Sequence, residues 1–450
     1  MAPEDFDPGP LILPPEDPVE WPGWRETLRA WREEKRREID LSSYERPEFA
    51  WMRDGAVCGM AMLFDEEFRD VDAYLERHQR EFGGLDALVL WQAYPRIGID
   101  RRNQFDHYRL APGLKGTVER LHERGVRVFM GYNPWDTGTR REPVPDAEAI
   151  GRIAGEFGFD GVFLDTLPGA PEDLRAVLDR VKPGIVMESE LALAVEGLPH
   201  HHASWAQWFE DGEAPGVLRN RWLERGHTMH LVRRWDHDHS GELHLAWMNG
   251  TGVLVWENVF GSWNGWSDRD KSILRAMSAV RRRYAEQFGR GDWEPLVPCT
   301  LEGVYASRWS YGSVTLWTLV NRKGETVEGS ALPIASDGTV RLFDLIRGIE
   351  LDHAHLRIPG RGIGALLALP SRLVDDEFLA FLSERRQSPL SDGGRTELLP
   401  TRLSPLPGGD AFEPVVARFR ARECGEYGPA PFSSAYPALH FERRISMLAS

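Results

Sequence analysis

The sequence predicts an α/β protein: a (β/α)8 barrel followed by a small antiparallel β-sandwich domain. Eight short apolar runs lie between residues 56 and 257, with amphipathic helical patterns in most of the gaps, and a further helical pattern follows the eighth run. Strands and helices that alternate in this way indicate a parallel sheet, and eight such units close a barrel. The rival fold, an open doubly wound sheet, is disfavoured because no GxGxxG follows the first run.

Each predicted helix should carry an apolar stripe along the face that packs against the barrel. Residues Leu174, Val177, Leu178 and Val181 fall on one face at helical spacing. After the eighth run, Ser267 is expected to cap a helix that closes the barrel. The eight runs cover residues 56–64, 87–94, 126–133, 161–166, 185–190, 203–208, 227–233 and 252–257.

Four segments are predicted. Residues 1–54 form an N-terminal extension with a helix around 24–39, and residues 55–292 form the barrel. Residues 293–387 alternate like strands and end in a helix, which predicts the β-sandwich. Residues 388–450 form a Pro/Gly/Ser-rich linker and a tail, with one strand-like stretch at 412–420.

Composition excludes several classes of partner. There are 54 Lys and Arg against 70 Asp and Glu, a net charge of −16, which repels nucleic acid. No apolar stretch approaches the roughly 20 residues that span a bilayer, and no signal peptide pattern is present. The three cysteines are widely spaced and predict neither disulfides nor a CxxC metal site. We therefore expect a cytoplasmic protein that binds neither nucleic acid nor membrane and needs no cofactor.

Carboxylates end several of the predicted strands, where a barrel carries its function. Asp165 ends the fourth run, and Glu188 stands as far from Gly184 as Asp165 does from Gly161. Two carboxyl groups at adjacent strand ends suit glycoside hydrolysis, which needs one ionised carboxylate and one protonated carboxyl. Crowding drives their pKa values apart and so assigns the two roles. The alternative is that these acids cap helices or pair with arginines.

Aromatic, amide and cationic side chains gather at the same strand ends. Aromatic faces stack on the apolar faces of sugar rings, and polar tips bond to hydroxyls. The expected substrate-binding residues are Trp91, Tyr94, Tyr132, Asn133, Trp135, Asp136, Trp205, Gln207, Trp208, Arg234, His237, Trp256 and Trp263.

Seven of the fourteen histidines fall between residues 200 and 239, which raises the possibility of a metal site. However, the first predicted strand lacks the HxH typical of metal-dependent barrel hydrolases, and no HExxH occurs. We predict no metal. A metal-dependent hydrolase that uses the His237/His239 region remains an alternative, as does a non-catalytic carbohydrate-binding protein.

The stretch Gly158 to Thr166, GFDGVFLDT, resembles the fourth strand of retaining glycoside hydrolase barrels of the α-amylase-like, dextranase-like and endo-α-N-acetylgalactosaminidase-like families. The resemblance covers about residues 55–385. It implies a retaining glycosidase with a carbohydrate substrate, in which Asp165 is the nucleophile and Glu188 the acid/base. The alternative acid/base candidates are Glu190, Glu257 and, after the sixth strand as in α-galactosidase-like barrels, Asp211.

The sequence also departs from the α-amylase pattern. Phe163 stands where an Arg precedes the nucleophile by two residues, and no clear His-Asp pair closes the site. The prediction is therefore a glycosidase that cleaves an O-glycosidic bond with a carboxylate pair, without a named sugar.

Overall fold

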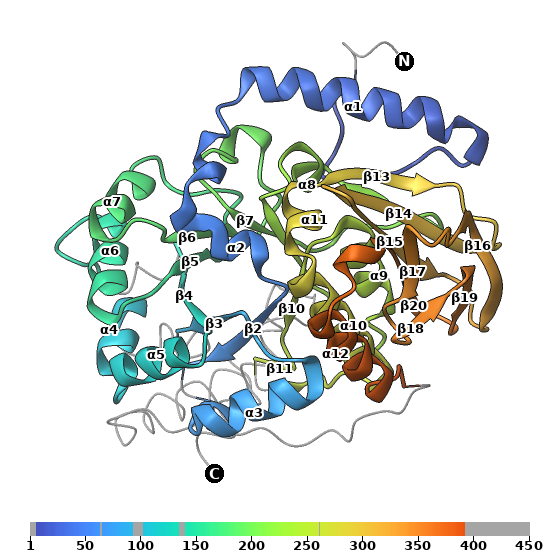
Figure 1. Ribbon diagram of the computed structural model, residues 1–450. Coiled ribbons are helices and arrows are strands. Elements are labelled where there is room, and N and C mark those ends of the chain that lie inside the picture. Colours follow the sequence, from blue (N-terminus) through green and yellow to red (C-terminus); the bar gives the residue numbers. More distant parts are fainter. Residues whose placement is uncertain (1–5, 64, 93–101, 135–139, 261, 392–450) are drawn as a thin grey trace, which may run out of the picture.

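A computed structural model describes residues 6–63, 65–92, 102–134, 140–260 and 262–391. Eight parallel strands close a barrel in the order β10-β2-β3-β4-β5-β6-β7-β9, and each corresponds to one of the eight predicted runs. The chain continues into two antiparallel sheets. Figure 1 shows the barrel and this β domain side by side. The predicted fold class is confirmed.

The barrel strands are β2 (Val57–Met62), β3 (Ala87–Trp91), β4 (Arg127–Tyr132), β5 (Gly161–Leu164), β6 (Val186–Ser189), β7 (Ala203–Ala206), β9 (Thr228–Leu231) and β10 (Gly252–Val255). The helices among and after them are α3 (Val71–Phe82), α4 (Gln104–Leu110), α5 (Leu114–Glu123), α6 (Asp146–Phe157), α7 (Leu174–Val181), α8 (Arg219–Leu223), α9 (Ser240–Asn249), α10 (Asp268–Arg283) and α11 (Ala285–Arg290). Three short strands complete this region: β8 (Val217–Leu218), β11 (Asn258–Val259) and β12 (Ser262–Trp263).

Two separate apolar clusters show which way each barrel strand faces. Alternate residues of the strands, such as Phe129, Phe163 and Val186, pack together inside the barrel. The residues between them, such as Val162 and Met187, pack outward against the helices. Because side chains alternate along a strand, this parity also fixes the direction of the polar residues that follow each strand.

The N-terminal extension spans both parts of the molecule. Helix α1 (Trp21–Glu38) contacts α8 of the barrel and the first strand of the β domain (Figure 1). Arg32 donates to the carbonyl of Trp222 in the barrel, and Arg25 donates to the carbonyl of Leu296 in the β domain. One arginine of α1 therefore binds each part. Strand β1 (Leu11–Ile12) pairs with β8, and α2 (Ala50–Asp54) leads into the barrel.

The β domain is a sandwich. One sheet has the order β13-β14-β15-β20-β17-β18, the other is the pair β16-β19, and an apolar cluster from both sheets fills the space between them. The strands are β13 (Asp292–Val297), β14 (Val304–Tyr311), β15 (Val314–Asn321), β16 (Val327–Ala335), β17 (Val340–Asp344), β18 (Ile349–Leu351), β19 (His353–Ile358) and β20 (Ile363–Pro370), followed by α12 (Asp376–Gln387).

The helix that follows the last barrel strand begins as the sequence predicts. The Ser267 hydroxyl accepts a hydrogen bond from the amide of Asp270, as an N-cap residue does. The buried apolar residues continue to Phe288, but the helix is interrupted at Tyr284, between α10 and α11. The strand-like stretch 412–420 lies outside the described residues. None of the helices in the described ranges is both long and apolar enough to cross a membrane.

Candidate active site

Asp165 and Glu190 meet at the C-terminal end of the barrel. Strands β5 and β6 pair with Gly161 opposite Val186 and Phe163 opposite Glu188, so two residues further on Asp165 comes level with Glu190. Both side chains face the interior, because Phe163 and Val186 do. Asp165 is 4% exposed and Glu190 is 6% exposed. Their carboxyl groups share a hydrogen bond.

The two carboxyls have unequal support. Asn133, which follows β4, donates from Nδ2 to Asp165 Oδ2 over 2.5 Å. Glu190 receives the backbone amide of Thr166 at 2.7 Å and Gln207 Nε2 at 3.1 Å. Arg234 adds a guanidinium nitrogen 3.4 Å from Glu190 Oε1. Glu190 is therefore the better place for a negative charge.

The electrostatics follow from these contacts. Burial and the adjacent Glu190 carboxylate raise the pKa of Asp165 well above its ordinary value. Burial alone would raise the pKa of Glu190 as well, but the hydrogen bond with Asp165, the Arg234 charge and its other donors hold it below its ordinary value. The opposite directions of these two pKa shifts favour a pair that holds one proton, on the Asp165 side, and one negative charge.

Three tryptophan rings surround the guanidinium of Arg234. Its central carbon lies 5.3 Å from the ring centre of Trp256, 5.7 Å from that of Trp208 and 6.0 Å from that of Trp205. Trp205 and Trp256 are buried inside the barrel, whereas Trp208 is 60% exposed. Cation–π attraction and the weak hydration of a guanidinium favour an arginine at this buried position.

Backbone strain flanks the carboxyl pair. Thr166 has φ +59° and Trp208 has φ +63°, a region that side chains with a Cβ seldom adopt and that is rarer still for the β-branched Thr166. The turn at Thr166 aims its amide at Glu190, and the turn at Trp208 follows Gln207 directly. Strained residues persist where the surrounding structure holds them, and they concentrate at functional sites.

The structure places Glu188 elsewhere, one layer deeper in the barrel. It lies opposite Phe163, is fully buried, and its Oε1 is 2.5 Å from Nδ1 of His230. Asp165 and Glu188 each lie four residues after a glycine, Gly161 and Gly184, and this equal spacing makes Glu188 the counterpart of Asp165. In the structure, however, Gly161 pairs with Val186, two residues beyond Gly184, so Glu190 lies level with Asp165.

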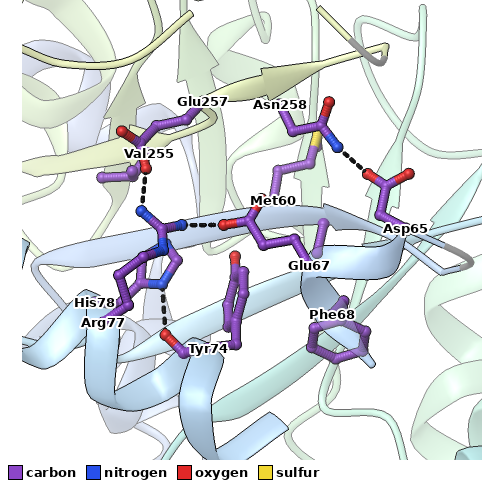
Figure 2. Close-up of a pocket in the computed structure, with 11 residues that line it drawn as sticks. Met60, Asp65, Glu67, Phe68, Tyr74, Arg77, His78, Val255, Glu257 and Asn258 are labelled. Atoms are coloured by element: carbon purple, nitrogen blue, oxygen red, sulfur yellow. Dashed lines mark hydrogen bonds and ion pairs between the residues drawn. The ribbon is translucent and has the colours of Figure 1, made fainter. Parts of the chain in front are cut away.

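Glu257 faces the outer side of the barrel, with Val255, rather than the interior. Figure 2 shows it in a polar pocket, with Arg77 between it and Glu67. Arg77 Nη1 is 2.5 Å from Glu257 Oε2, and Lys271 Nζ is 3.7 Å from Glu257 Oε1. The negative charge of Glu257 is thus compensated by Arg77 of α3 and Lys271 of α10. The structure does not bring Glu257 to Asp165.

Asp211 joins the barrel to the sandwich. It forms an ion pair with Arg322 of the β domain and accepts the backbone amides of Gly212 and Gly216. These contacts give it a structural position rather than one beside the carboxyl pair.

The remaining predicted binding residues fall into distinct groups. Trp91 is buried inside the barrel against Trp256 and Phe163. Tyr132 faces outward and donates to Asp146 over 2.7 Å. Trp263 packs over Arg77, 5.4 Å from ring centre to guanidinium carbon, and His237 is exposed on the loop after β9. Tyr94, Trp135 and Asp136 lie outside the described residues.

The histidines of the metal hypothesis are spread over several environments. His227 bonds to Tyr44 and Ser204, and His239 bonds to Glu242. Within the described ranges, no group of three or more His, Cys, Asp or Glu side chains is arranged to hold a metal ion.

Among the groups that contact the pair, the amide of Thr166 was not anticipated from the sequence. Its role depends on a left-handed turn, and a threonine gives no sequence signal of such a turn.

No family model matches this chain, and no curated protein matches it. Solved structures to which it is similar include an α-amylase from Anoxybacillus, with 12% identity over 71% of this chain and 99% of that one, at a TM-score of 0.48. A GH27 β-L-arabinopyranosidase from Geobacillus stearothermophilus aligns with 9% identity over 72% and 99%, at a TM-score of 0.45. A debranching enzyme from Nostoc punctiforme aligns with 11% identity over 70% and 98%, also at 0.45. These similarities are distant.

Proposed function

We propose that this protein is a glycoside hydrolase and that Asp165 and Glu190 are its catalytic carboxyl pair. The observation that carries the proposal is the direct contact of these two buried acids at the C-terminal end of the barrel, where their surroundings raise the pKa of Asp165 and lower that of Glu190. Glycoside hydrolysis requires this combination of an acid and a carboxylate. Glu190 replaces Glu188 as the partner of Asp165, because Glu188 lies one layer deeper and bonds to His230.

The shared proton has to move for a retaining reaction with Asp165 as the nucleophile. The raised pKa of Asp165 favours the proton on this side chain before substrate binds. Its transfer to Glu190 along the shared hydrogen bond leaves Asp165 ionised and Glu190 protonated. Asp165 then attacks the anomeric carbon while Glu190 protonates the leaving oxygen, and Glu190 later removes a proton from the water that hydrolyses the glycosyl–Asp165 ester.

Substrate entry must also separate the two side chains. Carboxyl groups of retaining glycosidases stand about 5 to 5.5 Å apart, with the scissile bond between them. Before substrate binds, the hydrogen bond holds the two carboxyl groups closer together than this separation. The entering glycosidic oxygen therefore replaces that hydrogen bond. Asn133 on one side and Gln207 on the other stay bonded to their own carboxyl and limit the movement to the pair.

Trp208 provides a surface for the sugar ring. One face of its ring is turned to Arg234, and the side chain is 60% exposed although it follows Gln207 directly at the site. An exposed indole beside a carboxyl pair suits the apolar face of a pyranose.

The test compares wild type, Asp165→Asn, Glu190→Gln and Glu188→Gln on a panel of aryl α- and β-glycosides, with and without chelator. We expect chelator-resistant turnover in wild type and loss of turnover in the first two variants. Glu188→Gln is the matched control, an acid of the same strand, and it should retain activity in its folded fraction. Turnover that survives in both Asp165→Asn and Glu190→Gln would refute the proposed pair.

The roles within the pair are tested by covalent trapping. A 2-deoxy-2-fluoro glycosyl fluoride of the active sugar should label Asp165, which mass spectrometry of the digested protein identifies. A label on Glu190 would reverse the two roles and leave the proposed activity intact. Product of inverted configuration in the first turnover would exclude the retaining mechanism.

A further inference from the structure

Arg234 follows β9, on the interior face that also carries His230 and Val232. Its guanidinium is 3.4 Å from Glu190 Oε1, and both side chains are only 8% exposed. It is therefore close enough to act on the carboxyl pair and too enclosed to be an ordinary surface cation.

The three tryptophan rings around Arg234 restrict its position further. A guanidinium is planar and weakly hydrated, so it tolerates a dry site between aromatic faces, whereas an ammonium group does not. Trp205 and Trp256 close the inner side of this cage and Trp208 closes the outer side. The cage fixes where the positive charge stands relative to Glu190.

A buried pair of acids needs such a charge. Two carboxyl groups removed from water each favour the neutral form, and without a nearby cation the pair keeps both protons to higher pH. The reaction requires a pair with one proton, not two. The described groups that face Glu190 are Asp165 from β5, Thr166 and Gln207 as neutral donors, and Arg234 from β9. The Glu188–His230 pair lies one layer below.

We propose that Arg234 is a positioning residue that acts through Glu190: it holds the Glu190 carboxylate in place and keeps one negative charge on the pair, and it does not bind an anionic group of the substrate. This inference rests on the proposed function only for its catalytic consequence. The charge balance of the pair exists with or without turnover.

The test uses two variants and a neighbouring control. Arg234→Met removes the charge and keeps an apolar side chain in the cage, and Arg234→Lys keeps the charge without the planar group. The control is Arg233→Met, because Arg233 lies next in sequence and donates to the backbone carbonyl of Phe209 instead of to the pair. Thermal melting of all three variants establishes that they are folded.

Two measurements are made as a function of pH. The first is kcat/KM on the active glycoside. The second is the infrared absorption of protonated carboxyl groups, assigned to the pair by its loss in Asp165→Asn, and it needs no substrate. Loss of a positive charge disfavours the ionised pair. In Arg234→Met the acidic limb of the rate profile and the infrared titration should both move to higher pH, by about one to three pH units for an opposite charge at this distance.

The outcomes separate the alternatives. An upward shift in Arg234→Met, a smaller one in Arg234→Lys and none in Arg233→Met support the inference. An unshifted infrared titration in Arg234→Met overturns it, even if turnover falls. If wild type hydrolyses no glycoside, the proposed function fails, while the infrared titration still decides the role of Arg234.

Discussion

Polar side chains are buried at both ends of the barrel, and the two ends bury them differently. At the N-terminal end, His227 bonds through Nδ1 to Tyr44 and through Nε2 to Ser204, so both ring nitrogens of His227 have a complementary partner. His202 stacks on Phe49 with ring centres 3.8 Å apart. At the C-terminal end, the carboxyl groups of Asp165 and Glu190 share a hydrogen bond, and the Arg234 guanidinium lies 3.4 Å from Glu190.

The difference separates stability from function. At the strand starts, His227 has complementary neutral partners and Asp160 is compensated by Lys182 and Arg127. Two acids buried in contact are unfavourable for folding, and such pairs concentrate where the chemistry needs them. In a (β/α)8 barrel the C-terminal face carries the active site and the opposite face carries stability, and the site that we propose lies on the C-terminal face.

The largest expected effect comes from breaking the carboxyl pair. Asp165→Asn keeps the shape and removes an acid, so we expect a loss of roughly 10⁴-fold in kcat/KM. Because the substitution also removes an ionisable group from a crowded buried site, the melting temperature should stay the same or rise. Parallel assays and thermal melts check both. A clear fall in melting temperature would assign Asp165 to the stability of the barrel.

Low pH should destabilise the protein through the buried histidines at the N-terminal end of the barrel. Burial lowers the pKa of His202 to about 3, and burial with nearby cationic groups also holds the pKa of His227 far below its ordinary value. The unfolded chain binds these protons near pH 6.5, whereas the folded chain does not. The free energy of unfolding should therefore be highest above pH 6.5 and fall steadily as the pH decreases toward 3, by up to about 1.4 kcal/mol per pH unit for each such histidine.

Urea unfolding at several pH values measures this slope. His202→Phe is the matched variant, since a phenyl ring keeps the stack on Phe49 and cannot take up a proton. This variant should lower the pH dependence of the free energy of unfolding by the contribution of one proton, up to about 1.4 kcal/mol per pH unit. An unchanged slope would mean that His202 is not neutral in the folded protein.

The sequence predicted the barrel because its evidence is local. Eight apolar runs alternate with amphipathic helices, and the strand ends, the Ser267 cap and Asp165 all follow from that pattern. Asn133 and Gln207 were also predicted as substrate-binding residues, because Asn133 ends the third run and Gln207 lies on the sixth.

The sequence could not show whether Glu188 or Glu190 lies level with Asp165, because the answer depends on the register between two strands. Neighbouring barrel strands are staggered, and the stagger is a property of the closed sheet rather than of either strand. Gly161 pairs with Val186, two residues beyond Gly184, so counting from each glycine selects Glu188.

Glu257 shows a second limit of the same kind. Alternation along the eighth run places Val253, Val255 and Glu257 on one face of a strand. Both faces of a barrel strand are apolar, so the pattern does not tell the inner face from the outer one. The outer position of Glu257 follows from the closed structure alone.

The smallest expected effect is at the rim of the site, where Trp208 combines exposure with a strained backbone. Trp208→Ala should raise KM about tenfold through the lost stacking, with little change in kcat. Trp208→Gly removes the same ring and also suits φ +63°, so it should match Trp208→Ala in KM and exceed it in melting temperature. Tyr311→Ala, which removes an exposed ring from the sandwich, is the control and should change neither. If both Trp208 variants leave KM unchanged, this exposed indole does not contact the sugar, and the strain at its backbone then serves only to place Gln207 against Glu190.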